Sequence, residues 1–399
     1  MTDKPQFVGQ KVKLSDICSI VSGATPKTTV KDYWGGDIKW ITPSELNDDS
    51  HVIYNTAKHL TEAGFASARL RMFPEGTVLL TTRAPIGKVA IAGEPMCCNQ
   101  GFKNLVCSDA VNNEYLYRYL KNRSSELQAL GRGATFKELS KKEVAAYEIN
   151  LPPLKRQLEA VEKLALVDKQ VVIAKTQLDK LDSLVKSRFV EMFGDPIRNP
   201  LRMSVSSVEE LAAPIKNSMK AGPFGSALKK EVYAESGYKV YGQEQVISGN
   251  QFLGNYYIDK EKYEQLNSCK VMPGDVLISL VGTVGKVLIL SEDCQPGIIN
   301  PRLVKITFDK RKIFPEYFAI AFSLESVRSS LLGRAHGQTM NVLNLGMIKK
   351  LKLPVPPISR QKEYLNFVAQ VDKSRFVAQQ QIEKLQMLYD SLAQEYFGD

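Results

Sequence analysis

The sequence predicts an α/β protein in which two similar α/β domains, related by a pseudo-twofold axis, are separated by two long antiparallel coiled-coil helices. Three observations lead to this fold class. The second half of the chain repeats motifs of the first half in the same order. Two segments of roughly 40 residues have the apolar spacing of a coiled coil. The remaining segments contain short apolar runs bounded by glycine, which is typical of strands.

The repeat extends over most of the chain. An internal repeat of this length predicts two copies of one structural unit, so the fold of the whole chain must contain that unit twice. The first parts of the two copies vary, and the last parts match better. The matching segments, first copy against second copy, are "PEGTVLLTTRAPIGKVAI" (74–91) and "PGDVLISLVGTVGKVLI" (273–289), "GATFKEL" (133–139) and "GQTMNVL" (337–343), "LPPLKRQLE" (151–159) and "VPPISRQKE" (355–363), and "LDKLDSLVKSRFVEMFGD" (178–195) and "IEKLQMLYDSLAQEYFGD" (382–399).

The segments that follow Pro153 and Pro357 are predicted to be helices, because neither Pro nor Gly occurs between Pro153 and Gly194 or between Pro357 and Gly398. Apolar residues recur there at steps of three or four, which is a coiled-coil seam. The first seam runs through Leu154, Leu158, Val161, Leu164, Val167, Val171, Ala174, Leu178, Leu181, Val185, Phe189 and Met192. The second runs through Leu365, Val368, Val371, Ala378, Ile382, Leu385, Tyr389, Leu392 and Tyr396.

A helix of roughly 40 residues spans about 60 Å and cannot bury its apolar stripe alone. The simplest partner for each helix is the other copy. If the two pair antiparallel, the second helix returns to the first domain, and the final "FGD" (397–399) lies near the N-terminus. The alternative is a pair of uncoupled modules joined by a helical linker. The expected divisions are a first domain over 1–150, a central helical spacer over 151–195, a second domain over 196–354 and a C-terminal helical spacer over 355–399.

Each domain is expected to be an α/β globule with a small twisted sheet. The runs "GTVLLTT" and "GDVLISLVG" are short, apolar, rich in β-branched residues and bounded by Gly, which is typical of strands. "YLYRYL" (115–120) and "EYFAIAFSLESVRSSLLG" (316–333) are predicted to be helical. The repeated Gly-Lys dipeptide is predicted to form a tight turn between two strands.

Composition favours an anionic partner. The chain has 53 Lys and Arg against 43 Asp and Glu, a formal net charge of +10, which suits nucleic acid, although a mildly basic enzyme remains open. The polar start is unlike a signal peptide, and no apolar run is long enough to cross a bilayer. We therefore expect a cytoplasmic protein without membrane contact, whose reduced thiols mostly fill the core. The cysteines, which lack metal-ligand spacing, are Cys18, Cys97, Cys98, Cys107, Cys269 and Cys294.

The repeated Gly-Lys stretch differs from a nucleotide-binding loop. A phosphate loop requires Ser or Thr directly after Gly-Lys, to hold magnesium. Val89 and Val287 occupy this position, and Gly282 precedes Gly285 by only three residues. A structural role is the better interpretation, and whether Lys88 and Lys286 touch DNA phosphates is left open.

Other catalytic patterns are weak. His51, His59 and His336 show none of the spacing of a zinc site. Asp37-Ile-Lys39, with Asp32 nearby, resembles the carboxylate pattern of a nuclease, but its setting looks like a turn and strand, and the second half shows no copy of it. No Gly-rich dinucleotide fingerprint and no base-methylation tetrapeptide was found. We predict neither a catalytic residue nor a metal site in this chain.

Two similar basic domains held apart by a spacer suit a duplex with two half-sites. Arg and Lys side chains match guanine edges and phosphates, and Asn and Gln side chains match adenine. The candidate DNA-binding residues of the first domain are Arg83, Lys88, Asn99, Gln100, Lys103, Arg132 and Lys137. Those of the second domain are Lys220, Lys229, Lys230, Gln243, Gln245, Lys286, Arg302, Arg334 and Gln338.

These features resemble the specificity subunit of type I restriction–modification systems. Each domain is followed by a "PP-x-x-RQ-x-E" turn into a long helix. "SGATPKTTVKDYWGGDIKWITPSEL" (22–46) and "AGPFGSALKKEVYAESGYKVYGQEQV" (221–246) look like openings of target recognition domains of that family. The resemblance covers nearly the whole chain, and it depends on the order and repetition of motifs more than on any single motif.

The resemblance implies a non-catalytic subunit that grips a split site in double-stranded DNA with its two target recognition domains. It also implies that the helices hold two modification subunits, which bind S-adenosylmethionine and methylate adenine, while this chain holds no cofactor. Restriction subunits that translocate DNA and cut it would complete the complex. Three alternatives remain: a stand-alone nuclease or modification enzyme, a scaffold that does not read DNA, and the recognition component of a single-gene or two-gene restriction enzyme.

Overall fold

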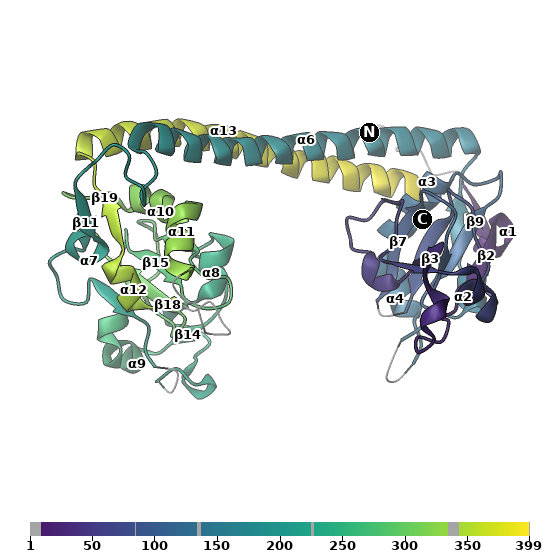
Figure 1. Cartoon of the computed structure of the whole chain (residues 1–399), viewed down its shortest axis with the longest axis horizontal. Coiled ribbons are helices and arrows are strands. Elements are labelled where there is room, and N and C mark those ends of the chain that lie inside the picture. Colours follow the sequence, from purple (N-terminus) through teal and green to yellow (C-terminus); the bar gives the residue numbers. More distant parts are fainter. Residues whose placement is uncertain (1–8, 84, 134–136, 225–226, 334–342, 399) are drawn as a thin grey trace, which may run out of the picture. The chain divides into compact units, whose positions relative to one another are not determined.

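The computed structural model describes residues 9–83, 85–133, 137–224, 227–333 and 343–398. The chain divides into two compact units: unit 1 comprises Met1–Lys175 with Gln380–Asp399, and unit 2 comprises Thr176–Gln379. Two 40-residue helices, α6 (Leu154–Phe193) and α13 (Ile358–Phe397), each contribute one end to unit 1 and the other end to unit 2 (Figure 1).

The strands of unit 1 form a five-stranded sheet of order β2-β9-β6-β7-β4, a three-stranded sheet of order β5-β3-β8 and a ribbon of β1 and β10. The strands are β1 (Gln10–Lys13), β2 (Cys18–Ser22), β3 (Trp34–Ile41), β4 (Val52–Ile53), β5 (Lys58–Leu60), β6 (Val78–Thr82), β7 (Ile86–Ala92), β8 (Cys97–Cys98), β9 (Lys103–Cys107) and β10 (Glu148–Leu151). The helices are α1 (Leu14–Ile17), α2 (Glu62–Ser67), α3 (Asn113–Asn122), α4 (Ser124–Leu130) and α5 (Lys141–Ala146), with short 3₁₀ turns η1 (Lys31–Tyr33) and η2 (Pro43–Glu45).

Unit 2 repeats this topology with sheets of order β12-β18-β15-β16 and β14-β13-β17 and a ribbon of β11 and β19. Its strands are β11 (Val205–Ser207), β12 (Met219–Ala221), β13 (Tyr238–Tyr241), β14 (Tyr257–Ile258), β15 (Val276–Ser279), β16 (Val287–Ile289), β17 (Gly297–Ile299), β18 (Leu303–Ile306) and β19 (Lys352–Pro354). Its helices are α7 (Val208–Leu211), α8 (Gln243–Ser248), α9 (Lys260–Gln265), α10 (Pro315–Ser323), α11 (Glu325–Leu332) and α12 (Leu345–Lys350), with 3₁₀ turns η4 (Lys230–Val232) and η5 (Asn267–Cys269).

The α/β class and the duplication are therefore confirmed strand by strand. Among the strands of the described residues, only β4 lacks a counterpart in unit 2. The expectation of one small sheet per domain was wrong. β3 and β13 pair in parallel with β8 and β17, away from the main hairpin, and so each domain builds a second small sheet. The two predicted helical segments are helices, and the second one is broken at Leu324 into α10 and α11.

The end of α13 packs into the core of unit 1. Tyr396 and Phe397 are buried there against α3. The Tyr115 hydroxyl donates to the Tyr396 carbonyl at 3.2 Å, and the Tyr115 and Phe397 ring centroids are 5.4 Å apart. On the α6 side, the Arg156 guanidinium pairs with the Glu395 carboxylate at 3.0 Å. The predicted return of the second helix to the first domain is confirmed by these contacts.

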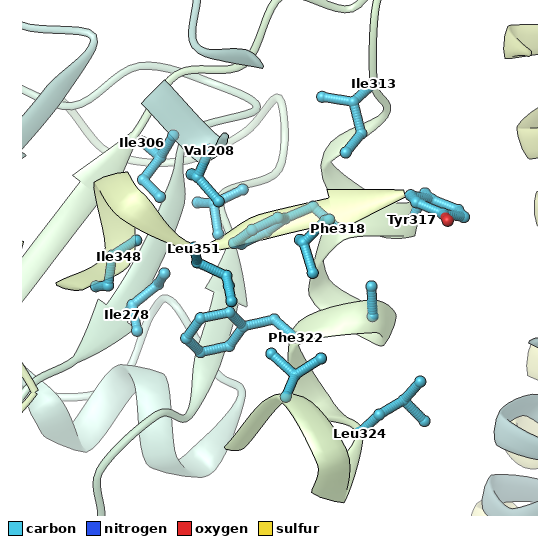
Figure 2. Packing of buried hydrophobic residues seen from close by; sticks show 14 of the residues in the cluster. Val208, Ile278, Ile306, Ile313, Tyr317, Phe318, Phe322, Leu324, Ile348 and Leu351 are labelled. Atoms are coloured by element: carbon cyan, nitrogen blue, oxygen red, sulfur yellow. The ribbon is translucent and has the colours of Figure 1, made fainter. Parts of the chain in front are cut away.

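The end of α6 packs into the core of unit 2 in the same way. The Phe193 ring lies 5.1 Å from that of Tyr317 and 5.5 Å from that of Tyr364, centroid to centroid. The Tyr364 hydroxyl donates to the Val185 carbonyl at 2.8 Å. Figure 2 shows Tyr317 at one edge of the hydrophobic core cluster of unit 2, to which α10 also contributes Phe318 and Phe322. Within each unit, therefore, α6 and α13 run antiparallel.

The predicted seam of α6 needs one correction at its start. Leu154 and Leu158 are 46% and 44% exposed, whereas Gln157 and Ala160 are fully buried. The reason is that the first turn is oriented by the Gln157 amide, which turns the two leucines outward. From Val161 onward the predicted α6 positions, and all those predicted for α13, are buried or half-buried.

The buried glutamine explains the repeated "RQ" of the two helix starts. Gln157 accepts a hydrogen bond from the Asn112 N–H at 2.8 Å and donates to the carbonyls of Ala110 at 3.1 Å and Pro152 at 2.8 Å. Its counterpart Gln361 makes the same three contacts, with the Phe314 N–H at 3.0 Å, the Lys312 carbonyl at 3.1 Å and the Pro356 carbonyl at 2.8 Å. Each amide therefore joins its long helix to its own domain by pairing backbone groups that would otherwise be buried without partners.

The Gly-Lys dipeptide occupies two different places. In unit 2, Gly285 and Lys286 lie between β15 and β16, as the predicted turn requires, and Gly285 has a φ of +75°. In unit 1, Gly87 and Lys88 lie inside β7, so the turn prediction was wrong for that copy. The cause is a longer first hairpin, because β7 already begins at Ile86, beside an irregularity in its register with β6.

Candidate nucleic-acid interface

A surface hollow of about 330 Å³ in unit 1 brings together three of the predicted DNA-binding residues, Arg83, Asn99 and Gln100. Arg83 comes from the β6–β7 turn, whereas Asn99 and Gln100 follow β8. The remaining lining comes from the turn after β3 and from the residue after Gln100, namely Thr42, Pro43, Ser44 and Gly101. The hollow thus combines a guanidinium with amide groups, which are the side chains that recognise base edges.

Backbone contacts hold the two amides of this hollow in place. The Asn99 N–H donates to the Ile41 carbonyl at 3.0 Å, which extends the pairing of β3 with β8 by one residue. The Asn99 side-chain oxygen accepts from the Gly101 N–H at 2.9 Å. The Thr25 hydroxyl donates to the Gln100 side-chain oxygen. Both side-chain bonds engage the oxygen of the amide, which fixes the orientation of each side chain.

A charged cluster lies next to the hollow. The Lys103 ammonium is 3.8 Å from the Glu138 carboxylate, and burial lowers its pKa, opposed by Glu138. The Arg132 side chain is 85% exposed and pairs with Glu143 at 3.1 Å. Backbone bridges join Glu138 to both Arg83 and Arg132. The predicted basic residues Arg83, Lys103 and Arg132 therefore gather around Glu138. Lys103 is a buried member of an ion pair there, and its contact with DNA stays a prediction.

Unit 2 presents a related cluster at the same place in its fold. The Asn300 N–H donates to the Tyr241 carbonyl at 2.9 Å, as Asn99 does to Ile41. The Asn300 side-chain oxygen accepts from the Arg302 N–H at 2.9 Å. The Arg302 guanidinium lies 3.5 Å from the Gln243 side-chain oxygen, and the Gln243 amide donates to the Val281 carbonyl. Gln243 and Arg302, which were predicted as separate candidates, thus meet at the surface of unit 2.

Sequence reasoning missed Asn300. The two asparagines follow β8 and β17 at equivalent positions, so the matched pairs "CNQG" (98–101) and "INPR" (299–302) were a usable signal. The guanidinium beside each asparagine comes from a different point of the chain. In unit 1 it belongs to Arg83 in the hairpin turn, and in unit 2 to Arg302, which directly precedes β18.

Gln245 has a structural role in place of its predicted contact with DNA. It is fully buried. Its side-chain oxygen accepts from the Gly242 N–H at 2.7 Å, and its amide donates to the Leu253 carbonyl at 2.6 Å. In unit 1, Glu45 accepts from the Thr42 N–H at 2.8 Å in the same way. Both side chains cap the short helical turn behind the interface.

The remaining candidates are dispersed. The half-buried Lys88 donates from its ammonium to the Leu46 carbonyl at 2.8 Å, and its contact with a DNA phosphate stays a prediction. Lys137, Lys229 and Lys286 are exposed, and Lys220 is half-buried in β12. Whether the exposed lysines touch DNA stays a prediction. Arg334, Gln338 and the side chain of Lys230 lie outside the described residues.

The pattern Asp37-Ile-Lys39 is also structural at its lysine. The Lys39 ammonium donates to the Tyr54 carbonyl at 2.7 Å and pairs with Glu94. Its counterpart Lys239, which the sequence did not reveal as a copy, donates to the carbonyls of Phe252 at 3.1 Å and Gly254 at 3.0 Å. Within the described part of the chain no group of three or more His, Cys, Asp or Glu side chains is placed to hold a metal, and no helix there is long and apolar enough to cross a membrane.

The comparison with known families agrees with this duplicated arrangement. A family model described as the type I restriction modification DNA specificity domain matches residues 9–183 and 222–387, which is well over half of the chain. The chain belongs to this family. Each matched range covers most of one specificity domain and part of the helix that follows it, so the family accounts for both copies of the repeat.

Several specificity subunits are similar to the chain. That of the type I restriction enzyme MjaIX from Methanocaldococcus jannaschii is 38% identical over 192 residues, 47% of this chain and 44% of that protein. The aligned region thus spans less than half of the length of that relative. The MjaVIII subunit from the same organism is 19% identical over 392 residues, 94% of this chain and 88% of that protein.

Solved structures show the same fold. A chain from a structure concerned with complex assembly and conformational transition of the type I R-M system aligns over all of both chains, with a TM-score of 0.62 and 16% identity. The S subunit of the type I restriction–modification system from M. genitalium aligns over 100% of this chain and 98% of that one, with a TM-score of 0.50 and 13% identity.

Proposed function

We propose that this chain is the sequence-specific DNA-recognition subunit of a type I restriction–modification complex. It reads a bipartite site, one half with each specificity domain, and directs adenine methylation or restriction by partner subunits. The observation that supports this proposal is the pair Asn99 and Asn300. The same backbone position holds the same amide in both domains, whereas the side chains around it differ. Copied scaffolds with exchanged polar groups are what two different half-sites require.

The surfaces of the long helices support assembly with two modification subunits. Large apolar side chains stay exposed on α6 and α13 in each unit. In unit 1 they include Leu166 (60% exposed) and Met387 (70% exposed), and in unit 2 they include Leu184 (47% exposed) and Phe376 (64% exposed). We propose that these exposed apolar groups form part of an interaction surface. We place the docking of the modification subunits there.

In the proposed complex this chain is not catalytic, and the partner subunits carry out the reactions. S-adenosylmethionine and the methyl transfer to adenine belong to the modification subunits, and DNA translocation and cleavage belong to the restriction subunits. The complex acts on double-stranded DNA in the cytoplasm. The recognition chain contributes base contacts, and it also sets how the two modification subunits are held.

The decisive experiment maps adenine methylation across the genome of the source cell, with and without this gene, in a strain that carries an active modification subunit. Loss of one split motif, two short half-sites with an unspecified gap, is the expected result. An unchanged map contradicts the proposal. Methylation or cleavage by the purified chain alone would favour a stand-alone enzyme, and sequence-independent binding by the assembled complex would favour a scaffold.

A matched pair of arginines tests the second domain. Arg302 and Arg311 are both exposed, but Arg302 directly precedes β18 and Arg311 lies beyond its other end, paired with Asp309 at 2.9 Å. Arg302→Ala should reduce discrimination against the wrong base at one position of one half-site by about 1–3 kcal/mol. Arg311→Ala should leave the methylated motif unchanged. If both variants behave alike, the interface does not lie where Arg302 places it.

A further inference from the structure

The opening segment of unit 2 exposes a single aromatic ring. Phe224 is 92% exposed, more than any other large apolar side chain among the described residues, of which the next is Met387 at 70%. Apolar atoms are common on protein surfaces, but a nearly fully exposed phenylalanine has lost most of the roughly 1.5–3 kcal/mol that burying its ring would contribute. Such a ring suits a contact that forms only with a partner.

The backbone around Phe224 is held against the proposed interface. A Cβ added to Gly222 would lie 1.8 Å from the Asn300 carbonyl oxygen, so the chain can cross Asn300 only with glycine at this position. The Gly222 N–H donates to the carbonyl of Leu303, the residue that follows Arg302, at 2.9 Å. The Ala227 N–H donates to the Phe224 carbonyl at 2.8 Å. Phe224 therefore projects from a short segment fixed beside Asn300 and Arg302.

The first domain shows what stands at this place in the other copy. A Cβ on Gly23 would lie 2.1 Å from the Asn99 carbonyl oxygen, which makes Gly23 the counterpart of Gly222. Two residues further on, Thr25 is the counterpart of Phe224, and its hydroxyl donates to the side-chain oxygen of Gln100 in the hollow. One copy thus presents a hydroxyl to the recognition hollow, and the other copy presents an aromatic ring.

We propose that Phe224 makes an apolar contact with a base of the half-site that unit 2 reads, and so contributes to the specificity of that half alone. This inference rests on the proposed function. A phenylalanine ring can pack on the methyl group of a thymine in the major groove or enter between two base pairs as a wedge. Both contacts use the same apolar chemistry, and neither is available to Thr25 in the first domain. The neighbouring guanidinium of Arg302 supplies the attraction to DNA that brings the ring to the bases.

The test uses the complex of this chain with its modification subunits. Methylation rates are measured on duplexes that carry the split motif and on duplexes with single substitutions in each half. Phe224→Ala should lower discrimination at a position of the second half-site by about tenfold or more, with the first half-site unaffected. Phe224→Thr, which copies the first domain, should behave like Phe224→Ala, and Phe224→Leu should retain part of the discrimination.

Ile215 provides a matched control. It is 48% exposed and lies before β12, at the opposite end of that strand from Gly222. Ile215→Ala should leave both half-sites unchanged. Because Phe224 is nearly fully exposed, its variants should fold like the parent chain, which thermal unfolding checks. Equal discrimination by Phe224→Ala and the parent chain overturns the inference, and so does an equal loss of rate on all sequences. A parent complex that methylates without a split motif overturns the proposed function itself.

Two DNA probes separate the two forms of the contact. Replacing each thymine of the second half-site by deoxyuridine removes only the methyl group, and an effect that matches Phe224→Ala identifies a methyl contact. 2-Aminopurine in the second half-site brightens when a base step is unstacked, and a rise that requires Phe224 identifies a wedge. If neither probe responds to the presence of Phe224, the ring does not touch a base, and the inference fails.

Discussion

The two specificity domains share their strand order, yet they bury different polar pairs at one point of that shared frame. In unit 2, Asp275 and Lys305 are buried, with the ammonium 3.4 Å from the carboxylate. In unit 1, the register of β6 with β9 puts Thr77 and Asn104 at the same places. Both are buried, and neither is charged.

This difference teaches that the frame does not depend on one particular polar arrangement. Asp275 also accepts from the Met272 N–H at 3.0 Å and from the Thr307 hydroxyl. Thr77 donates instead to the Pro74 carbonyl at 2.7 Å, and Asn104 donates to the Cys98 sulfur at 3.1 Å. Both copies keep the apolar strands and turns of the common fold, while the buried polar groups and their partners differ between them. The surface pairs Asn99 with Arg83 and Asn300 with Arg302 follow the same rule.

The largest expected effect comes from breaking the ionic pair. Lys305→Met leaves the buried Asp275 carboxylate without its cation, which should destabilise unit 2 by about 3–5 kcal/mol. Lys305→Asn combined with Asp275→Thr copies the first domain and should cost less than half as much, because contacting residues are not additive. Hydrogen exchange of β15 and β18 measures both effects. A double variant as unstable as Lys305→Met would show that the first-domain pair does not fit the second frame.

The two tryptophans provide an internal control for that experiment. Both Trp34 and Trp40 lie in unit 1, with ring centroids 5.0 Å apart, and the chain contains no others. Intrinsic tryptophan fluorescence therefore reports on unit 1 alone. The fluorescence unfolding curve should be the same for the parent chain and for both variants of unit 2. A shifted curve would mean that the two units do not unfold independently.

The elements that the sequence predicted best are those with local causes. Spacing of apolar residues and the lack of Pro or Gly identified both long helices, and the repeated motifs identified two copies of one fold. Leu154 and Leu158 were misplaced because an apolar pattern cannot show that a polar Gln157 is the buried residue of that turn. The Gly-Lys dipeptide was misplaced in one copy because the length of a hairpin depends on the pairing of its strands.

The candidate site could be predicted in residue type but only partly in membership. Arg83, Asn99 and Gln100 were chosen because their side chains match base edges and phosphates, and the fold brings them together because the β6–β7 turn lies beside the end of β8. Gln243 and Gln245 are alike in sequence, and only the helical turn that begins at Gln243 decides which one is buried. Lys103 and Lys88 similarly acquire their roles from distant partners, which a single sequence does not reveal.

A smaller effect is expected from the two buried glutamines at the helix starts. Gln157→Met and Gln361→Met keep the shape of the side chain but remove three hydrogen bonds to backbone groups. Each should destabilise its own unit by about 2–4 kcal/mol, because buried donors and acceptors then lack partners. Fluorescence should detect Gln157→Met only, and hydrogen exchange of α10 should detect Gln361→Met only.

The matched control is Gln177→Met, at an exposed position of α6. Its effect on the free energy of unfolding should stay within about 0.5 kcal/mol. A difference of more than twofold between the two buried glutamines would show that the copies have diverged in how each helix is fixed to its domain. Similar losses would show that this junction is the part of the repeat held most constant.

The smallest expected effect concerns the capping boxes of α5 and α7. The Ser140 and Ser207 N–H groups donate to the carboxylates of Glu143 and Glu210 at 2.8 Å and 2.7 Å. These backbone hydrogen bonds are the main reason that the pKa of each glutamate lies below its usual value. Ser140→Ala or Ser207→Ala should each cost about 1 kcal/mol, since the serine hydroxyls accept the return bonds from Glu143 and Glu210.

The pH dependence of these boxes has a definite sign. A carboxylate whose pKa is lower in the folded state stabilises the fold above the pKa of the unfolded chain, and this contribution is lost as the pH falls through the folded value. Glu143→Gln should therefore reduce the acid sensitivity of unit 1, and Glu210→Gln that of unit 2, measured by denaturant unfolding between pH 7 and pH 3. If only one of the two substitutions has this effect, the two capping boxes share their geometry but differ in their contribution to stability. The two domains would then differ in their structural elements as well as in their recognition residues.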